Sequence, residues 1–182
     1  MTDRHIIFAS FHHSDEFYKN RFEFLFKDVY DVLESKSVKD GDIDPTLKTE
    51  TIRQIIRDEF IRSASVTIVL ISTETWKRKY IDWEISSSIR QTKFNPRTGL
   101  IGILLPTYSK IGIKSNEYHI HTIPPWLYDN VKCGFAEIYE WTEDSETIKE
   151  LIHKAYLRKS KVDPNNSRDL FKNNHSGEQW SD

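Results

Sequence analysis

The side chain whose position best suits chemistry is a carboxylate, Glu84. It follows a tryptophan in the stretch RKYIDWEISSSI, residues 78–89, and the isoleucines of this stretch recur at helical spacing. On a helix, Glu84 flanks that apolar stripe, where a carboxylate is partly desolvated and can still reach a ligand. The alternative is an ordinary boundary glutamate that pairs with one of the basic residues 77–79. The spacing alone leaves both interpretations open.

The other candidate positions follow predicted strands, because ligands of open α/β sheets bind beyond the carboxyl ends of the strands. These positions are residues 10–15 after the first strand, 72–84 after the third, and the loop that begins at Pro106. His12 and His13 are adjacent, so their side chains point in different directions, and the chain has one cysteine. We therefore expect no metal site.

The sequence lacks the motifs of several other site classes. It has no G-x-G-x-x-G and no G-x-x-x-x-G-K-[ST], which excludes phosphate-binding loops of those types. No nucleophile-elbow sequence supports a Ser/His/Asp triad. A phosphoacceptor receiver domain would need an aspartate at the end of the third strand, and that strand ends in LIS.

The composition indicates one folded domain that does not bind nucleic acid. The 182 residues are 37% hydrophobic and 13% aromatic, which is enough for one core, and the net charge is only -2. The single cysteine, Cys133, suits a reducing compartment. No signal peptide is visible, and no apolar run approaches the roughly 18 residues that a membrane span requires. We expect a soluble, cytoplasmic protein with no membrane partner.

The elements that position these residues follow from hydrophobic periodicity. Strands are predicted at 5–11, 65–72, 99–106 and 135–141, with a very short one around Val38. Helices are predicted at 14–33, from Asp44 to Phe60, at 73–93 and at 142–159. This alternation predicts an α/β fold, an open and mainly parallel sheet of about five strands with helices on both faces.

Two regions interrupt the alternation. Residues 107–134 are predicted to be a long irregular connection, and long loops in compact domains are often functional. Residues 161–182 are polar and form either a loose tail or a docking segment, in which Leu170, Phe171 and Trp180 could make the contacts.

Three segments, 5–26, 56–72 and 73–89, together resemble the ThsB-type TIR-like domains of bacterial Thoeris anti-phage defence, within the TIR superfamily. The matching segments run from about His5 to Pro106, with weaker support from AEIYEWT later in the chain. The resemblance implies a flavodoxin-like, TIR-like domain over residues 1–160, followed by the tail or docking segment 161–182.

The resemblance also implies a set of site residues. In enzymatic TIR domains a glutamate of this helix cleaves the nicotinamide–ribose bond of NAD, and that position is Glu84. The first-strand pattern of such domains, which lines the NAD pocket, falls on Phe8, Ser10 and Phe11. Trp76 is an aromatic residue that would stack on a base of the dinucleotide. NAD is then the substrate, and no cofactor is expected.

ThsB-type members are similar to cyclases, which turn NAD into a cyclic ADP-ribose isomer that activates an effector of the ThsA type. The expected function is therefore immune signalling by an NAD glycohydrolase or ADP-ribosyl cyclase. The sequence departs from the TIR pattern at Ala9, where a bulkier apolar residue is usual, and the loop after Ser37 lacks the signature of animal TIR adaptors. The alternative is a non-catalytic TIR-like or flavodoxin-like module that signals by self-assembly.

Overall fold

Five parallel strands form one sheet in the order β2-β1-β3-β4-β5 in the computed structural model, which describes residues 4–29, 31–32, 37–110, 112–114 and 117–182. The strands are β1 (Ile6–Phe11), β2 (Asp31–Val32), β3 (Val66–Ile71), β4 (Gly99–Leu104) and β5 (Ala136–Glu140). All neighbouring strands are parallel. This is the flavodoxin-like order, and it confirms the predicted open α/β sheet.

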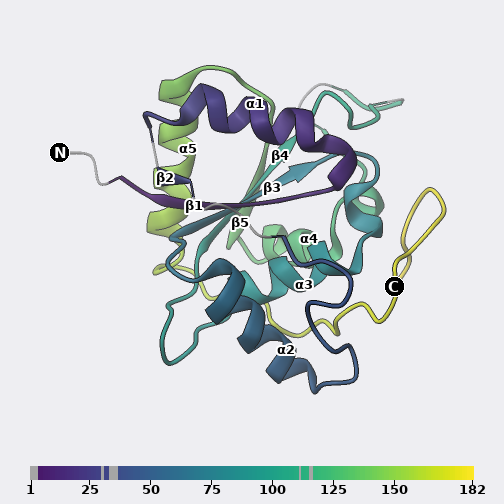
Figure 1. The fold of residues 1–182 in the computed structure, drawn as a ribbon. Helices are drawn as coiled ribbons and strands as arrows, with labels where there is room; N and C mark the ends of the chain where they lie inside the picture. Colours follow the sequence, from purple (N-terminus) through teal and green to yellow (C-terminus); the bar gives the residue numbers. More distant parts are fainter. Residues whose placement is uncertain (1–3, 30, 33–36, 111, 115–116) are drawn as a thin grey trace.

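Helices cover both faces of the sheet (Figure 1). The helices are α1 (Glu16–Phe26), α2 (Thr49–Ile55), α3 (Lys79–Ser88), α4 (Pro125–Lys132) and α5 (Ser145–Arg158). Ile68 and Leu70 of β3 pack against the layer of α1 and α5, whereas Val69 and Ile71 pack against α3 and α4. The alternation along β3 therefore divides the core into two layers.

The first helix is shorter than its apolar spacing predicts. A 3-10 turn, η1 (His13–Asp15), precedes α1, and the helix ends at Phe26. The residues of β2 then pair with Ile6 and Ile7 of β1, so the predicted helix over 14–33 is wrong in its last part. The short strand predicted around Val38 is also misplaced, because that segment is irregular and the edge strand comes earlier.

The second helix begins later than Asp44, where it was predicted to begin. A carboxylate oxygen of Asp44 accepts hydrogen bonds from the backbone N–H and the hydroxyl of Thr46, at 2.9 and 2.7 Å. This local turn competes with helix formation, so α2 begins at Thr49. The helix then widens into a π-helical turn, η2 (Ile56–Ile61), whose Ile56 is fully buried.

The predicted irregular connection 107–134 is wrong in its second half. A 3-10 turn, η4 (Ile120–Thr122), is followed by α4, which has a proline in its first turn. Proline is favoured there because the first N–H groups of a helix have no partner within it. Trp126 and Leu127 of α4 are buried against α3 and β4.

The predicted helix over 73–93 is interrupted at Arg78. A 3-10 turn, η3 (Thr75–Lys77), ends there, and Arg78 has extended backbone angles (φ -96°, ψ 120°) before α3 begins. The stripe of Ile81, Ile85 and Ile89 is buried, as the spacing predicts. Trp76, however, lies on η3 and not on the helix that carries Glu84.

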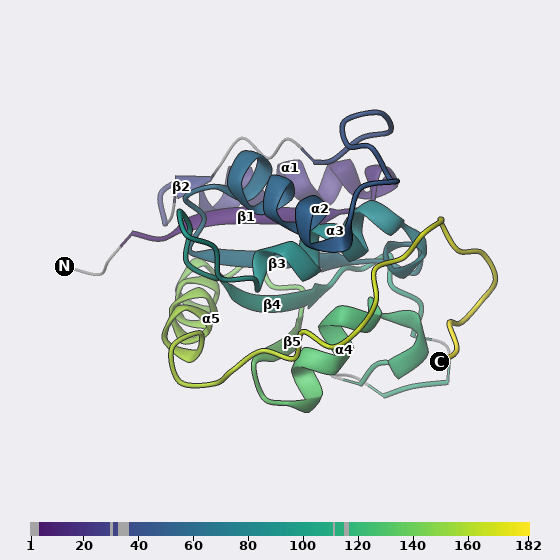
Figure 2. The same ribbon diagram turned by 90° about the horizontal axis from the view of Figure 1, so that it is seen from below.

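After α5 the chain crosses the layer of α3 and α4 and reaches the junction of η3 and α3 (Figure 2). Leu170 packs against the clusters on this side of the sheet, and Trp180 is buried. The indole N–H of Trp180 donates to the carbonyl of Ile123, with 2.7 Å between donor and acceptor. None of the helices in the described ranges is long and apolar enough to cross a membrane.

Candidate functional site

Glu84 of α3 is buried beside the end of β1, with only 1% of its surface exposed. Its Oε2 accepts a hydrogen bond from the hydroxyl of Ser10 at 2.6 Å, and its Oε1 accepts one from the backbone N–H of Val38 at 3.0 Å. Lys77, one of the basic residues considered as its partner, pairs with Glu74 instead. The carboxylate is thus held by hydrogen-bond donors from β1 and from the loop that contains Val38.

Burial dominates the ionisation of this group. It raises the pKa of Glu84 to about 7, although the hydrogen bonds from Ser10 and Val38 act in the opposite direction by favouring the carboxylate. A carboxyl group with such a pKa is divided between its charged and neutral forms at neutral pH. Shifts of this kind are common where a carboxyl group takes part in chemistry.

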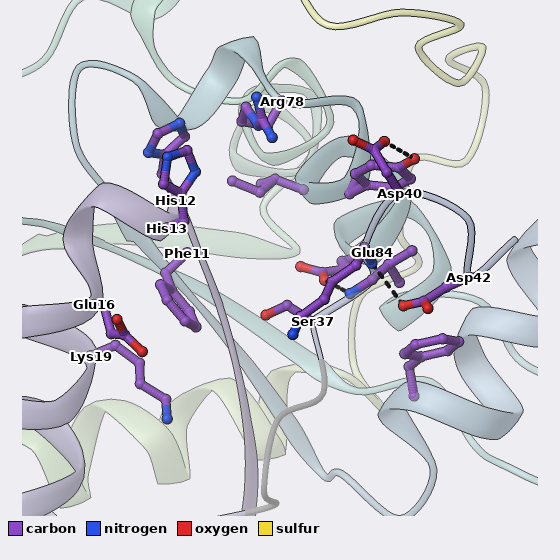
Figure 3. A pocket seen from close by; sticks show the side chains of 15 residues that line it. Phe11, His12, His13, Glu16, Lys19, Ser37, Asp40, Asp42, Arg78 and Glu84 are labelled. Carbon is purple, nitrogen blue, oxygen red and sulfur yellow. Dashed lines mark hydrogen bonds between the residues drawn. The ribbon is translucent and has the colours of Figure 1, made fainter.

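A cavity of about 900 Å³ opens beside Glu84 (Figure 3). This volume lies within the range of small-molecule and cofactor sites. The lining comes from the end of β1, η1, α1, the loop 37–42, η2 and the first turns of α3. The lining residues are Phe11, His12, His13, Glu16, Lys19, Ser37, Val38, Lys39, Asp40, Asp42, Phe60, Arg78, Tyr80, Ile81 and Glu84.

The cavity wall carries charges of both signs. His12, His13 and Arg78, which we call the basic wall, lie on one side of Glu84, and Glu16 and Lys19 lie on that side as well (Figure 3). Asp40 and Asp42 lie on the other side. Within the part of the chain that the structure describes, Arg78 forms no ion pair. Its guanidinium is therefore available to an anionic ligand.

His12 is set up as a neutral hydrogen-bond donor. Its Nδ1 accepts from the backbone N–H of Ser14 at 3.1 Å, so the ring proton belongs on Nε2. Burial lowers the pKa of His12 below its usual value, and the nearby charges of His13 and Arg78 lower it further. The rings of His12 and His13 are tilted by 33° with their centroids 4.2 Å apart, so the two side chains lie together and do not point in different directions as their adjacency predicts.

The loop 37–42 is fastened to α3 over Glu84. The hydroxyl of Tyr80 donates to Asp40 Oδ1 at 2.5 Å, and burial, with this hydrogen bond, raises the pKa of Tyr80 to about 12. Within the loop, the backbone N–H of Lys39 donates to Asp42 at 2.9 Å. These bonds and the one from Val38 hold the loop in place above the carboxylate.

The structure brings together some of the residues expected in the site and separates others. Phe11 and Glu84 line the cavity, and Ser10 bonds to Glu84 from behind it. Phe8 is fully buried in the cluster with α2 and α3 and does not reach the cavity wall. Trp76 is 1% exposed, and its ring lies 6.2 Å from that of His175, away from the cavity lining.

Two other lining residues carried no signal in the sequence. Asp40 and Asp42 belong to the wall because the loop folds back onto α3, and no periodicity or motif predicts that contact. Tyr80 and Arg78 fall within the candidate range 72–84, and both line the cavity. Among the residues described, no three His, Cys, Asp or Glu side chains are placed to hold a metal ion.

The arrangement suits one kind of ligand. A carboxylate with a raised pKa stabilises positive charge, and a basic wall with a neutral N–H donor binds phosphate oxygens. The cavity is large enough for both functions to act on a single molecule. A molecule with a cationic centre and phosphate groups would use both sides of the wall.

A family model described as "Thoeris protein ThsB, TIR-like domain" matches residues 8–110. The match covers most of β1, all of β2, β3 and β4, and every residue that lines the cavity. No curated protein matches the chain in sequence. Because the matched residues make up more than half of the 182, the chain belongs to the ThsB family and is a TIR-like protein of the Thoeris defence system.

Proposed function

We propose that this chain is a signalling enzyme that cleaves NAD at the nicotinamide–ribose bond and closes the remainder into a cyclic ADP-ribose isomer. The product then activates a partner effector of the ThsA type. The observation that supports the proposal most directly is the buried carboxylate of Glu84 at the wall of a 900 Å³ cavity. The family match places that cavity within a TIR-like domain.

Cleavage requires one carboxylate and no general acid. When the bond from ribose C1′ to the pyridinium nitrogen breaks, its electron pair leaves with nicotinamide, which becomes neutral. The ribose becomes an oxocarbenium-like cation, as in glycoside hydrolysis. Glu84 in its charged form stabilises that cation, and the stabilisation is strong because the site is shielded from water.

The basic wall would hold the diphosphate. Arg78 has a guanidinium suited to paired phosphate oxygens, and His12 presents Nε2–H as a further donor. Cyclisation then requires a hydroxyl of the adenosine ribose to attack the same C1′ in place of water, with loss of the hydroxyl proton. The dinucleotide must fold inside the cavity for this attack. Contacts of the ribose with Glu84 and of the diphosphate with the basic wall would favour the folded form.

The test is to incubate the full chain with NAD and to measure nicotinamide and the cyclised product. Glu84→Gln keeps the shape of the side chain and removes its charge, and we expect at least a hundredfold loss of turnover. Glu150→Gln, on the exposed side of α5, is the matched control and should retain the wild-type rate. Equal turnover by Glu84→Gln, or a wild-type chain that does not bind NAD, contradicts the proposal.

A second candidate function, signalling by self-assembly, is favoured by the surface of α1. Phe17 and Phe24 lie two helical turns apart and are 71% and 65% exposed. Exposed aromatic residues on one side of a helix are typical of contact surfaces. If assembly alone carries the function, protection against phage survives Glu84→Gln and is lost when both phenylalanines are changed to serine.

A further inference from the structure

Residues 171–175, which we call the C-terminal segment, form hydrogen bonds with the junction between η3 and α3. The backbone N–H of His175 donates to the carbonyl of Lys77 at 2.7 Å. The side-chain oxygen of Asn174 accepts from the backbone N–H of Lys79 at 3.0 Å. These two contacts lie on either side of Arg78, which belongs to the basic wall of the cavity.

A second pair of bonds fixes the same segment one turn further along α3. The backbone N–H of Phe171 donates to Asp82 Oδ2 at 2.9 Å, and the indole N–H of Trp83 donates to the carbonyl of Phe171 at 2.8 Å. The segment 171–175 therefore runs beside the first turn of the helix that carries Glu84. It lies outside the family match, which ends at residue 110.

The first turn of α3 needs such a partner. The first N–H groups of a helix have no acceptor within the helix, and a side chain of Ser, Thr, Asp or Asn usually supplies one. Arg78 stands at the N-cap position and forms no side-chain cap. Asn174, 95 residues after Lys79, supplies the missing acceptor to the N–H of Lys79 with the residue type that is preferred there.

The backbone N–H of Arg78 has little other support, because it reaches the carbonyl of Thr75 only at 3.5 Å, the upper limit for a hydrogen bond. The carbonyl of Arg78 accepts from the backbone N–H of Asp82 at 3.2 Å, and the dihedral angles of Arg78 belong to neither flanking helix. The position of its guanidinium in the cavity thus depends on how the two neighbouring turns are fixed. Both turns are bonded to the C-terminal segment.

We propose that Asn174 is a positioning residue of the candidate NAD site, which caps α3 from the C-terminal segment and so holds Arg78 on the cavity wall. The inference rests on the proposed function. Loss of the cap would fray the first turn, where Arg78 begins the helix, more than the second turn, where Glu84 lies. Binding of the phosphates would weaken, while cleavage of bound NAD would continue.

The experiment compares full-length variants in nicotinamide release, with KM and kcat measured separately at a temperature where all are folded. We expect Asn174→Ala to raise KM for NAD about fivefold, which is the change in an equilibrium constant that the loss of a typical helix cap produces. The value of kcat should be nearly unchanged. Asn174→Asp keeps a side-chain acceptor and should restore the wild-type KM. Asn173→Ala removes the adjacent, exposed asparagine and should have no effect.

A merely structural role predicts a different result. In that case Asn174→Ala lowers the melting temperature but leaves KM unchanged, and this result would overturn the proposal. Hydrogen exchange of the Lys79 amide is a readout that does not depend on activity, and we expect it to be faster in Asn174→Ala only. If the wild-type chain neither binds nor cleaves NAD, the proposed function fails, and unchanged exchange at Lys79 would separately overturn the capping role.

Discussion

The hydroxyl of Ser10 donates to Glu84 Oε2 at 2.6 Å and joins the end of β1 to the middle of α3. Both side chains are buried, so water does not compete for the bond. A donor on a buried carboxylate favours its charged form, which opposes the effect of burial. Ser10 therefore adjusts the pH at which Glu84 carries its charge.

Replacement of Ser10 should shift the pH dependence of the reaction. Without the hydroxyl, the pKa of Glu84 rises above about 7, because burial then acts with less opposition. In the proposed mechanism the charged form is the active one, so the acid limb of the profile of kcat against pH should move to higher pH in Ser10→Ala. Turnover should fall more at pH 6.5 than at pH 8.5. Ser160→Ala, in the exposed turn after α5, is the control, and a profile of Ser10→Ala that coincides with it would contradict the assignment.

Arg78→Ala should impair recognition of the diphosphate. A hydrogen bond to a charged group contributes about 1.5–3 kcal/mol, so KM for NAD should rise roughly 10- to 100-fold. Cleavage of nicotinamide riboside, which has no phosphate, should be unaffected by the same change. The assay is nicotinamide release from both substrates, with Arg4→Ala as an exposed control that pairs with Asp31. An equal loss on both substrates would show that Arg78 does not bind phosphate.

The free energy of unfolding should depend on pH through the ionisation of Asp82. Burial raises the pKa of Asp82 to about 8, although the backbone N–H of Phe171 and the charge of Arg168 lower it in part. Because the folded state then keeps a proton that the unfolded state has released, the contribution of Asp82 to the free energy of unfolding is full below about pH 4. It is lost as the pH rises towards 8.

The measurement is urea denaturation of the wild type and of Asp82→Asn between pH 4 and 8. The difference between them isolates Asp82 from other titrating groups, such as His12. We expect the wild type to lose stability relative to the variant by up to about 1.4 kcal/mol per pH unit. Parallel curves across this range would mean that Asp82 is charged in the folded protein.

Gly99 should not tolerate a side chain. A Cβ at this position would lie 2.4 Å from the backbone oxygen of Ala155 in α5, and backbone cannot move aside as a flexible side chain can. Gly99→Ala should therefore destabilise the protein by about 1–3 kcal/mol or more. The backbone of Gly99 is not in the left-handed region, so the clash with α5 is the cause of this loss. Similar melting temperatures for Gly99→Ala and the wild type would contradict the close contact.

The sequence predicts the parts of the fold that depend on local patterns. The structure contains the predicted strands β3 and β4 and the buried stripe of Ile81, Ile85 and Ile89. These could be predicted because the faces of an element that are buried determine the spacing of its apolar residues. The break at Arg78 is invisible locally, since the flanking turns are fixed by a segment almost a hundred residues away.

The site shows the same division. Glu84 and Phe11 could be placed near the cavity from strand ends and helical spacing, and both line it. The complete burial of Glu84 could not be predicted, because it requires the loop around Val38 to fold over the helix. Phe8 and Trp76 have the residue types of a binding site, but the packing around them turns both into core.

The bond from the backbone of Val38 to Glu84 Oε1 also affects how a substrate would bind. A ribose hydroxyl that reaches this oxygen takes the place of a donor that the protein already supplies. Binding is then an exchange of one hydrogen bond for another, and the measured affinity is the difference between two nearly equal terms. The same exchange means that the carboxylate of Glu84 keeps a hydrogen-bond donor on Oε1 until a competing hydroxyl replaces it.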